Sequence, residues 1–226
     1  MTGTIVNTCT IIAGSIIGSV FKKGIQEKHQ TALFNAMGLA ATGLGINSVV
    51  QNMPKSNYPV LFIVSLALGS LIGTSIDLDG RFKTLTDRLS VGQLSKGLST
   101  GILLFCIGTL SILGPIQSAL NGDHTYLFTN ATLDLVTSMV LASTYGLGII
   151  LCAVVLFCWQ GAIYMCALLL GNFVTPDMMT ELSVVGGFLI ASSGISILNI
   201  KDCKTMNMLP SLVVPVVFCW CMGLMG

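Results

Sequence analysis

Long runs of apolar residues alternate with short polar or glycine- and proline-containing segments along the whole chain. A helix that crosses a bilayer needs about 20 mostly apolar residues. Eight runs approach that length, and each predicts one transmembrane helix. Within a few residues, they are Gly3–Phe21, Thr31–Val50, Tyr58–Ile76, Gly97–Ile116, Ala131–Leu147, Ile149–Gly171, Leu182–Leu198 and Leu209–Leu224.

The fifth and sixth runs adjoin, and together they are too long for one span. We expect a tight turn at Gly146 and Gly148 to separate them, because glycine commonly ends or interrupts regular structure. The basic residues agree with this count. With eight spans, nine of the ten fall on one side of the membrane, which the positive-inside rule assigns to the cytoplasm, and both termini then lie outside. The nine are Lys22, Lys23, Lys28, Arg81, Lys83, Arg88, Lys96, Lys201 and Lys204, and Lys55 is the exception.

Similar apolar segments recur about one hundred residues apart. "MGLAATGLGI" (Met37–Ile46) resembles "MVLASTYGLGI" (Met139–Ile149). Two further pairs keep the same order and nearly the same offset: "IIAGSI" with "SILGPI" (residues 11–16 and 111–116), and "SLALG" with "ALLLG" (residues 65–69 and 167–171). A repeat of three spans must enter the membrane in opposite orientations, which is the inverted topology of many secondary transporters.

The predicted fold is therefore an all-α polytopic membrane protein with one transmembrane domain, residues 1–226. It comprises repeat A (3–77), a cytoplasmic linker (78–96), repeat B (97–171) and a C-terminal helix pair (182–225).

The composition supports the membrane class: 53% of residues are hydrophobic and 8% are charged, whereas about 25% are charged in a soluble domain. The net charge of +1 gives no electrostatic basis for binding nucleic acid. Seven of the eight cysteines lie in apolar runs, where they are interpreted as small buried residues. No metal site and no cofactor are predicted; the lipid bilayer is the expected partner, together with a second copy in a homodimer.

Asp134 is the one carboxylate placed inside a predicted span. Polar groups in hydrocarbon are costly, and ionisable ones commonly mark ion or proton pathways. Asp134 could bind a cation or carry a proton, with Ser138 one turn further on. It could equally be a solvated carboxylate at the start of a helix, where the helix dipole favours it.

Other polar residues in the spans are neutral. Asn7, Asn35 and Gln160 can form hydrogen bonds between helices, which are commonly structural, and Gln160 stands out in a wholly apolar run. Ser192 and Ser193 could line a cavity or bond back to their own helix. Asn47 follows the first copy of the repeated segment and is a further candidate for binding.

Glycine and proline mark places where a helix could break and expose backbone groups to an ion. The candidates are Gly43, Gly45, Gly114, Pro115, Gly146 and Gly148. Close helix packing explains Gly14-x-x-x-Gly18 and Gly69-x-x-x-Gly73 better, because their spacing places small residues on one face.

Several segments together resemble the bacterial membrane proteins catalogued as domain of unknown function 554 (DUF554). They are "AGSIIGS" after Asn7, "FNAMGLAATGLGI", "LGSLIG", "LGPIQSALNGD", "LDLVTSMVLASTYGLGI", "ELSVVGGFLIASSGI" and "MNMLPSLVVPV". The resemblance covers essentially the whole chain. It implies an integral protein of the bacterial inner (cytoplasmic) membrane and no established activity.

Two functions fit these patterns. The first is a small secondary transporter or channel for a small cation or a small neutral or zwitterionic solute. The second is a scaffold or sensor subunit that transports nothing. An enzyme is not expected, because no nucleophile is paired with an acid or base inside the spans.

Overall fold

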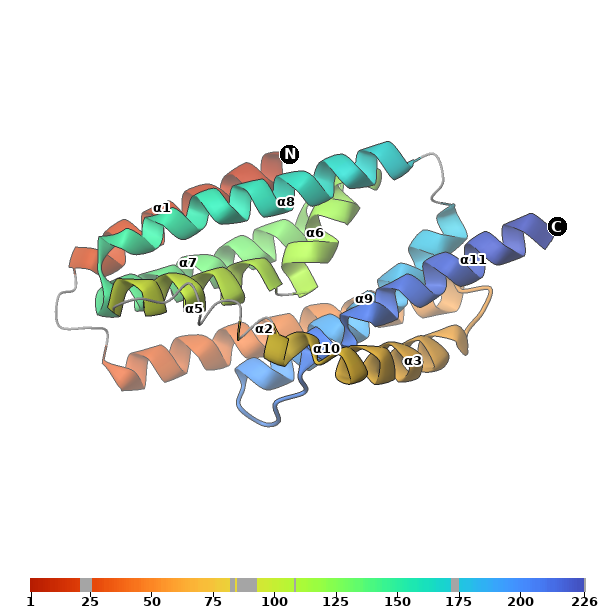
Figure 1. Ribbon diagram of the computed structural model, residues 1–226, viewed down its shortest axis with the longest axis horizontal. Coiled ribbons are helices and arrows are strands. Elements are labelled where there is room, and N and C mark those ends of the chain that lie inside the picture. The colour runs from red at the N-terminus through yellow and green to blue at the C-terminus, as the bar shows by residue number, and fades with distance from the viewer. Residues whose placement is uncertain (21–25, 82–83, 85–92, 108, 172–174, 226) are drawn as a thin grey trace. The chain divides into compact units, whose positions relative to one another are not determined.

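The computed structural model describes the chain except for residues 21–25, 82–83, 85–92, 108, 172–174 and 226, and the described residues form helices and no strand (Figure 1). The long helices are α1 (Thr2–Val20), α2 (Glu27–Asn52), α3 (Leu61–Ile76), α5 (Gln93–Ile107), α6 (Thr109–Leu120), α7 (Thr125–Tyr145), α8 (Leu151–Leu170), α9 (Pro176–Ile197) and α11 (Val213–Met225). Shorter turns are η1 (Met53–Lys55), η2 (Leu147–Ile150), α10 (Thr205–Met208) and η4 (Leu209–Leu212).

Five helical segments of the described chain are long and apolar enough to cross a membrane. They are Thr2–Val20, Glu27–Lys55, Leu147–Leu170, Pro176–Ile197 and Thr205–Met222. A sixth is the pair Thr100–Cys106 and Thr109–Leu120, which is bent by 41°. Each of the eight predicted runs falls on helix, but α3 has only 16 residues and α7 is not among the segments of sufficient hydropathy.

Backbone contacts divide the chain into two compact units. Unit 1 contains residues 1–34 and 81–171, and unit 2 contains residues 35–80 and 172–226. Each unit therefore combines segments far apart in the sequence, and the predicted repeats are not the packing units. Most of the linker (78–96) lies outside the described residues.

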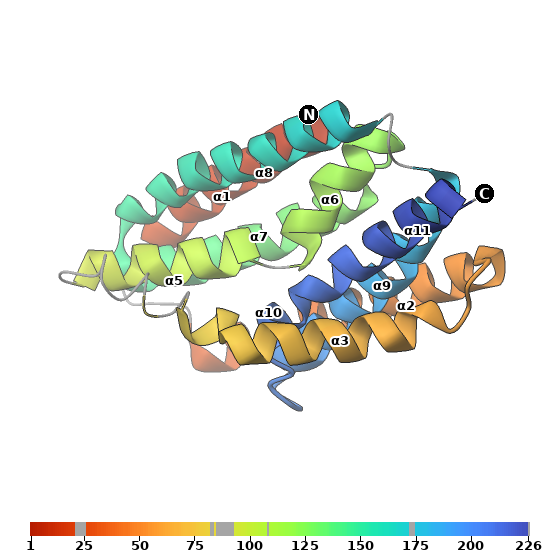
Figure 2. The same ribbon diagram turned by 45° about the vertical axis from the view of Figure 1, so that its right-hand side comes forward.

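Unit 1 is built around α1 and α7. Gly3 lies against Leu127 and Gly18 against Met139, so the two helices run parallel. The α5–α6 pair runs antiparallel to α7, because Gly101 lies near Leu141 and Gly114 near Leu127. The α8 helix runs alongside α1 in both views (Figures 1 and 2). An apolar core that includes Ile11, Phe105 and Leu156 fills the space among these helices.

Unit 2 packs α3 and α9 side by side and parallel, with Tyr58 bonded to Glu181 and Phe62 stacked on Phe188 at 4.8 Å. The α2 helix runs antiparallel to α9, since Gly38 meets Leu198 and Gly45 meets Gly187. The segment α10–η4 runs antiparallel to α3, where Gly69 and Gly73 lie against Ser211 and Asn207. Figure 2 shows α3 with α10 and α11 beside it.

The glycines behave differently from one another. Gly146 has a φ of 87° and ends α7, and Gly148 lies in the turn η2 that follows. The α2 helix continues through Gly43 and Gly45, so the break predicted there is absent. Gly45 instead permits close packing on α9. Gly114 and Pro115 lie inside α6, which extends to Leu120.

The contrast between Gly45 and Gly43 gives a stability test. A Cβ atom on Gly45 would lie 2.5 Å from the Gly187 carbonyl oxygen, whereas Gly43 has no atom within 4 Å of that position. Overpacking costs about 1–3 kcal/mol, while either alanine gains about 1 kcal/mol in helix propensity. We expect Gly45→Ala to lower the melting temperature in detergent and the control Gly43→Ala to leave it equal or raise it. Equal melting temperatures for the two variants would contradict this packing.

Candidate functional site

Asp134 lies in the middle of α7. The helix begins at Thr125, six residues before the predicted start of this span, because residues Asn121–His124 form the connection that precedes it. Asp134 is therefore nine residues into the helix, about 14 Å along its axis, and only 4% exposed. Asp134 is therefore not a solvated carboxylate in the first turn of its helix.

Two amide side chains surround the Asp134 carboxyl group. Asn130, one turn earlier in α7, donates a hydrogen bond from Nδ2 to Oδ2 at 2.9 Å. Asn7 faces the carboxyl group from α1, yet its Nδ2 makes no hydrogen bond of normal geometry. Among the residues that the structure describes, no basic side chain pairs with Asp134. Within the described part of the chain, the carboxylate thus has hydrogen-bonding neighbours and no counter-charge.

Further polar groups lie at the same level of unit 1. Leu127 of α7 contacts both Gly3 of α1 and Gly114 of α6. One turn from these contacts come Asn7 in α1, Asn130 in α7 and Ser111 in α6, and the helix directions place all three at a similar level along the helix axes. Ser111 accepts a hydrogen bond from Gln160 of α8 at 3.0 Å.

We call this set the polar layer: Thr4, Asn7, Ser111, Asn130, Asp134 and Gln160, each at most 5% exposed. It draws on four helices, α1, α6, α7 and α8. Such a layer can hold a small polar ligand or simply tie the helices together.

The hydrogen bonding of the layer is incomplete. Thr4 Oγ1, Asn7 Nδ2 and Gln160 Oε1 are buried and have no partner among the described residues; the same holds for Ser15 and Ser211 elsewhere. Pro115 in α6 has no N–H, so it cannot donate the regular helical hydrogen bond to the Ser111 carbonyl four residues earlier. Each orphaned buried group costs about 1–3 kcal/mol, so several in one layer point to an additional partner.

The remaining predicted site residues are not part of this layer, although Ser138 lies one turn after Asp134. Ser138 is buried in α7, but its hydroxyl bonds back to the Leu135 carbonyl. Asn35 and Asn47 are exposed on α2, where Asn47 accepts a bond from Gln51. Ser192 and Ser193 are half-buried in α9, and Ser192 contacts Thr205. The structure therefore places Asn7, Asp134 and Gln160 in the layer, leaves Ser138 beside Asp134 but bonded to its own helix, and places the others apart.

Sequence reasoning missed Thr4, Ser111 and Asn130. Asn130 was excluded because the span was started at Ala131, although the i, i+4 spacing to Asp134 places both on one helix face. Ser111 stands four residues before Pro115, and Ser211 likewise stands four residues before Pro215. The same serine–proline spacing thus occurs twice, one hundred residues apart, and this recurrence could have singled out Ser111 from the sequence.

A second buried carboxylate, Glu181, was also missed. It is 1% exposed in α9, and its Oε1 accepts hydrogen bonds from the Ser56 hydroxyl and the Tyr58 N–H. The predicted span began one residue later, at Leu182. Thr175, which caps α9, and Pro176 at its first position mark the earlier start. Through Oε1, Glu181 holds the connection between α2 and α3 in unit 2.

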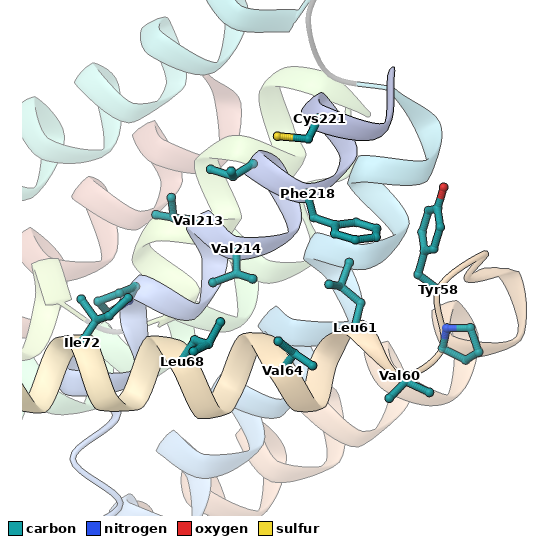
Figure 3. A pocket seen from close by; sticks show the side chains of 13 residues that line it. Tyr58, Val60, Leu61, Val64, Leu68, Ile72, Val213, Val214, Phe218 and Cys221 are labelled. Carbon is teal, nitrogen blue, oxygen red and sulfur yellow. The ribbon is translucent and has the colours of Figure 1, made fainter. Parts of the chain in front are cut away.

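Unit 2 also contains an apolar groove of about 950 Å³ between α3 and α11 (Figure 3). Figure 3 shows Val64 and Leu68 of α3 facing Val214 and Phe218 of α11. Its lining is nearly all aliphatic or aromatic. It offers no charged group and shares no residue with the polar layer, so it is not the candidate site for a polar solute.

Comparison with known proteins gives the family. The model of the family described as "Protein of unknown function (DUF554)" matches residues 2–220. "Uncharacterized membrane protein YdfK" of Bacillus subtilis (strain 168) is 57% identical over 217 residues, 96% of this chain and 95% of its own. "Uncharacterized protein YqgA" of Escherichia coli (strain K12) is 27% identical over 222 residues, 93% of each chain. No solved structure matches. The resemblance found in the sequence motifs is thereby confirmed, and the chain belongs to the DUF554 family.

Proposed function

We propose that this protein is a small secondary transporter or channel in the bacterial cytoplasmic membrane, and that a small cation or proton binds at Asp134. The observation that carries the proposal is the buried polar layer: one carboxylate, with no counter-charge from any described residue, lies among incompletely bonded amide and hydroxyl groups. A small neutral or zwitterionic solute that moves together with the ion also fits.

The cost of burying charge supports an ion. A carboxylate taken out of water loses several kcal/mol of solvation unless an opposite charge or a proton neutralises it. Asp134 is 4% exposed and lies mid-helix. The Asp134 carboxylate must be neutralised where it lies, and polar atoms without hydrogen-bond partners among the described residues lie in the same layer. It is therefore suited to take up and release a cation.

The proposed topology has eight alternating spans, with α5–α6 bent inside one of them and α3 and α7 as full spans. The helix directions within each unit support it. Spans one and five (α1 and α7) are parallel, spans two and seven (α2 and α9) are antiparallel, and spans three and eight (α3 and α10–η4) are antiparallel. If successive spans cross the membrane in alternating directions, each of these three relative orientations is required. The inverted repeat of spans one to three and four to six remains part of the proposal.

One observation favours the alternative of a scaffold or sensor subunit. Every member of the polar layer is at most 5% exposed, so the layer is closed to water in this conformation. A transporter passes through such an occluded state, whereas a scaffold would never leave it. Transport measurements separate the two.

The first experiment measures ion flux in liposomes that contain the purified protein, with either a Na⁺ gradient or a pH gradient imposed. We expect the wild type to dissipate one of these gradients, and Asp134→Asn to slow this at least tenfold because the amide carries no negative charge and takes up no proton. Asp202→Asn, in an exposed loop, serves as the control and should match the wild type. Wild-type rates equal to those of empty liposomes for both gradients would favour the scaffold.

The topology is tested with alkaline phosphatase fusions, which are active only outside the cytoplasm. We expect activity for fusions after Lys55 and after Gly226, and none for a fusion after Lys201. Green fluorescent protein at the same positions should give the opposite pattern. An active fusion after Lys201 together with an inactive one after Gly226 would overturn the orientation.

A further inference from the structure

We propose that a polar pocket of about 410 Å³ near the end of α3 binds the headgroup of an anionic phospholipid, with Lys201 and Lys204 contacting its phosphate group. The pocket belongs to unit 2 and shares no residue with the polar layer or with the apolar groove. Lipid binding there goes beyond the proposed ion transport and does not depend on it.

Three segments of unit 2 form this pocket, and each supplies polar side chains. Ser70 and Thr74 come from α3, Lys201 and Lys204 from the loop that follows α9, and Asn207 from α10. Hydroxyl and ammonium groups donate hydrogen bonds, and those to an ionised phosphate are stronger than those between neutral groups. The lining therefore has the chemistry that a phosphate group requires.

Hydrogen bonds hold the walls of the pocket in place. The Ser196 hydroxyl in α9 accepts a bond from the Cys203 N–H at 3.1 Å, which fixes the loop between the two lysines. Asn207 Oδ1 accepts a bond from the Asp79 N–H at 2.8 Å, which fastens α10 to the segment after α3. Because the pocket is already formed, binding a ligand requires little further ordering of the chain.

The pocket lies where lipid headgroups are expected. Thr74 is in the last turn of α3, which ends at Ile76. Ile200 directly precedes Lys201 and is 72% exposed, and contact with lipid explains so exposed an apolar side chain beside a charged loop. In the proposed topology Lys201 and Lys204 face the cytoplasm. Basic pockets between helices on that side of a membrane favour anionic headgroups.

One face of α3 leads from the pocket toward the hydrocarbon. Ile63, Ala67, Ser70 and Thr74 follow one another at intervals of four, three and four residues, which places them on one face of the helix. Ile63 and Ala67 are exposed. Thr74 and Ile63 are about 16 Å apart along the helix axis, which is close to one leaflet of a hydrocarbon core about 30 Å thick. An acyl chain can therefore lie along this face while its headgroup occupies the pocket.

The charge of the lining favours a phosphodiester over free phosphate. Lys201 and Lys204 each carry one positive charge and Asp202 carries one negative charge, so the lining has a net charge of +1. A phosphodiester has a single negative charge, which this lining neutralises. Inorganic phosphate slightly above neutral pH is mainly a dianion, and the Asp202 carboxylate would repel its second charge.

The test measures the melting temperature of the full-length protein, delipidated in nonionic detergent, as phosphatidylglycerol or phosphatidylcholine with the same acyl chains is added. A ligand that binds only the folded state raises the melting temperature with its concentration. We expect a rise with the anionic phosphatidylglycerol and none with the zwitterionic phosphatidylcholine. The double variant Lys201→Gln/Lys204→Gln should need at least a tenfold higher concentration of phosphatidylglycerol for half the rise. Lys201→Arg/Lys204→Arg keeps both charges and should respond as the wild type does.

The double variant Lys28→Gln/Lys55→Gln is the matched control, because it also removes two exposed lysines and neither lines the pocket. Its response to phosphatidylglycerol should equal that of the wild type. Equal rises with both lipids, or an equal loss of response in the control variant, would overturn the lipid site. A rise with inorganic phosphate at constant ionic strength, lost in Lys201→Gln/Lys204→Gln, would also overturn it and assign the pocket to a soluble anion.

Discussion

Hydrocarbon supplies no hydrogen-bonding partners, so each polar group inside a span must find one within the protein. Most hydroxyls here meet that requirement locally: Ser65, Ser75 and Thr129 donate to the carbonyl one turn earlier. Such self-contained polar groups can be buried at little cost and tie no helices together. The helices are held instead by close contacts between small residues, as where Gly45 meets Gly187 and Gly69 meets Ser211.

The same constraint makes the polar layer of unit 1 distinctive. Asn130 and Asp134 bond within α7, Gln160 bonds across to Ser111 of α6, and several atoms of the layer still have no partner among the described residues. Glu181 in unit 2 shows the contrasting case. It is as deeply buried, but a hydroxyl and a backbone N–H engage it, and it anchors the connection between α2 and α3. Two carboxylates in similar burial thus differ in their partners: Asp134 accepts a bond from an amide of its own helix, whereas Glu181 ties its helix to a different segment.

The apolar runs predicted helices well, because length and hydropathy are read directly from the sequence. Helix ends were harder to predict. The α7 helix starts six residues before its apolar run and α9 starts six residues before its own, since caps and polar residues within the first turns extend a helix beyond its apolar part. This error placed Asp134 too near the surface and excluded Asn130 and Glu181. Gly43 and Gly45 look alike in sequence, and only the packing against α9 distinguishes them.

Pro115 has a consequence of a different kind. Side chains of the polar layer, such as Thr4 and Gln160, can be substituted one at a time, and each substitution removes one polar group. The carbonyl oxygen of Ser111 is part of the backbone, and it loses its helical partner whatever side chain occupies residue 111. Any sequence that keeps the proline therefore keeps, at this point of unit 1, a carbonyl oxygen whose partner must come from outside the regular helical pattern.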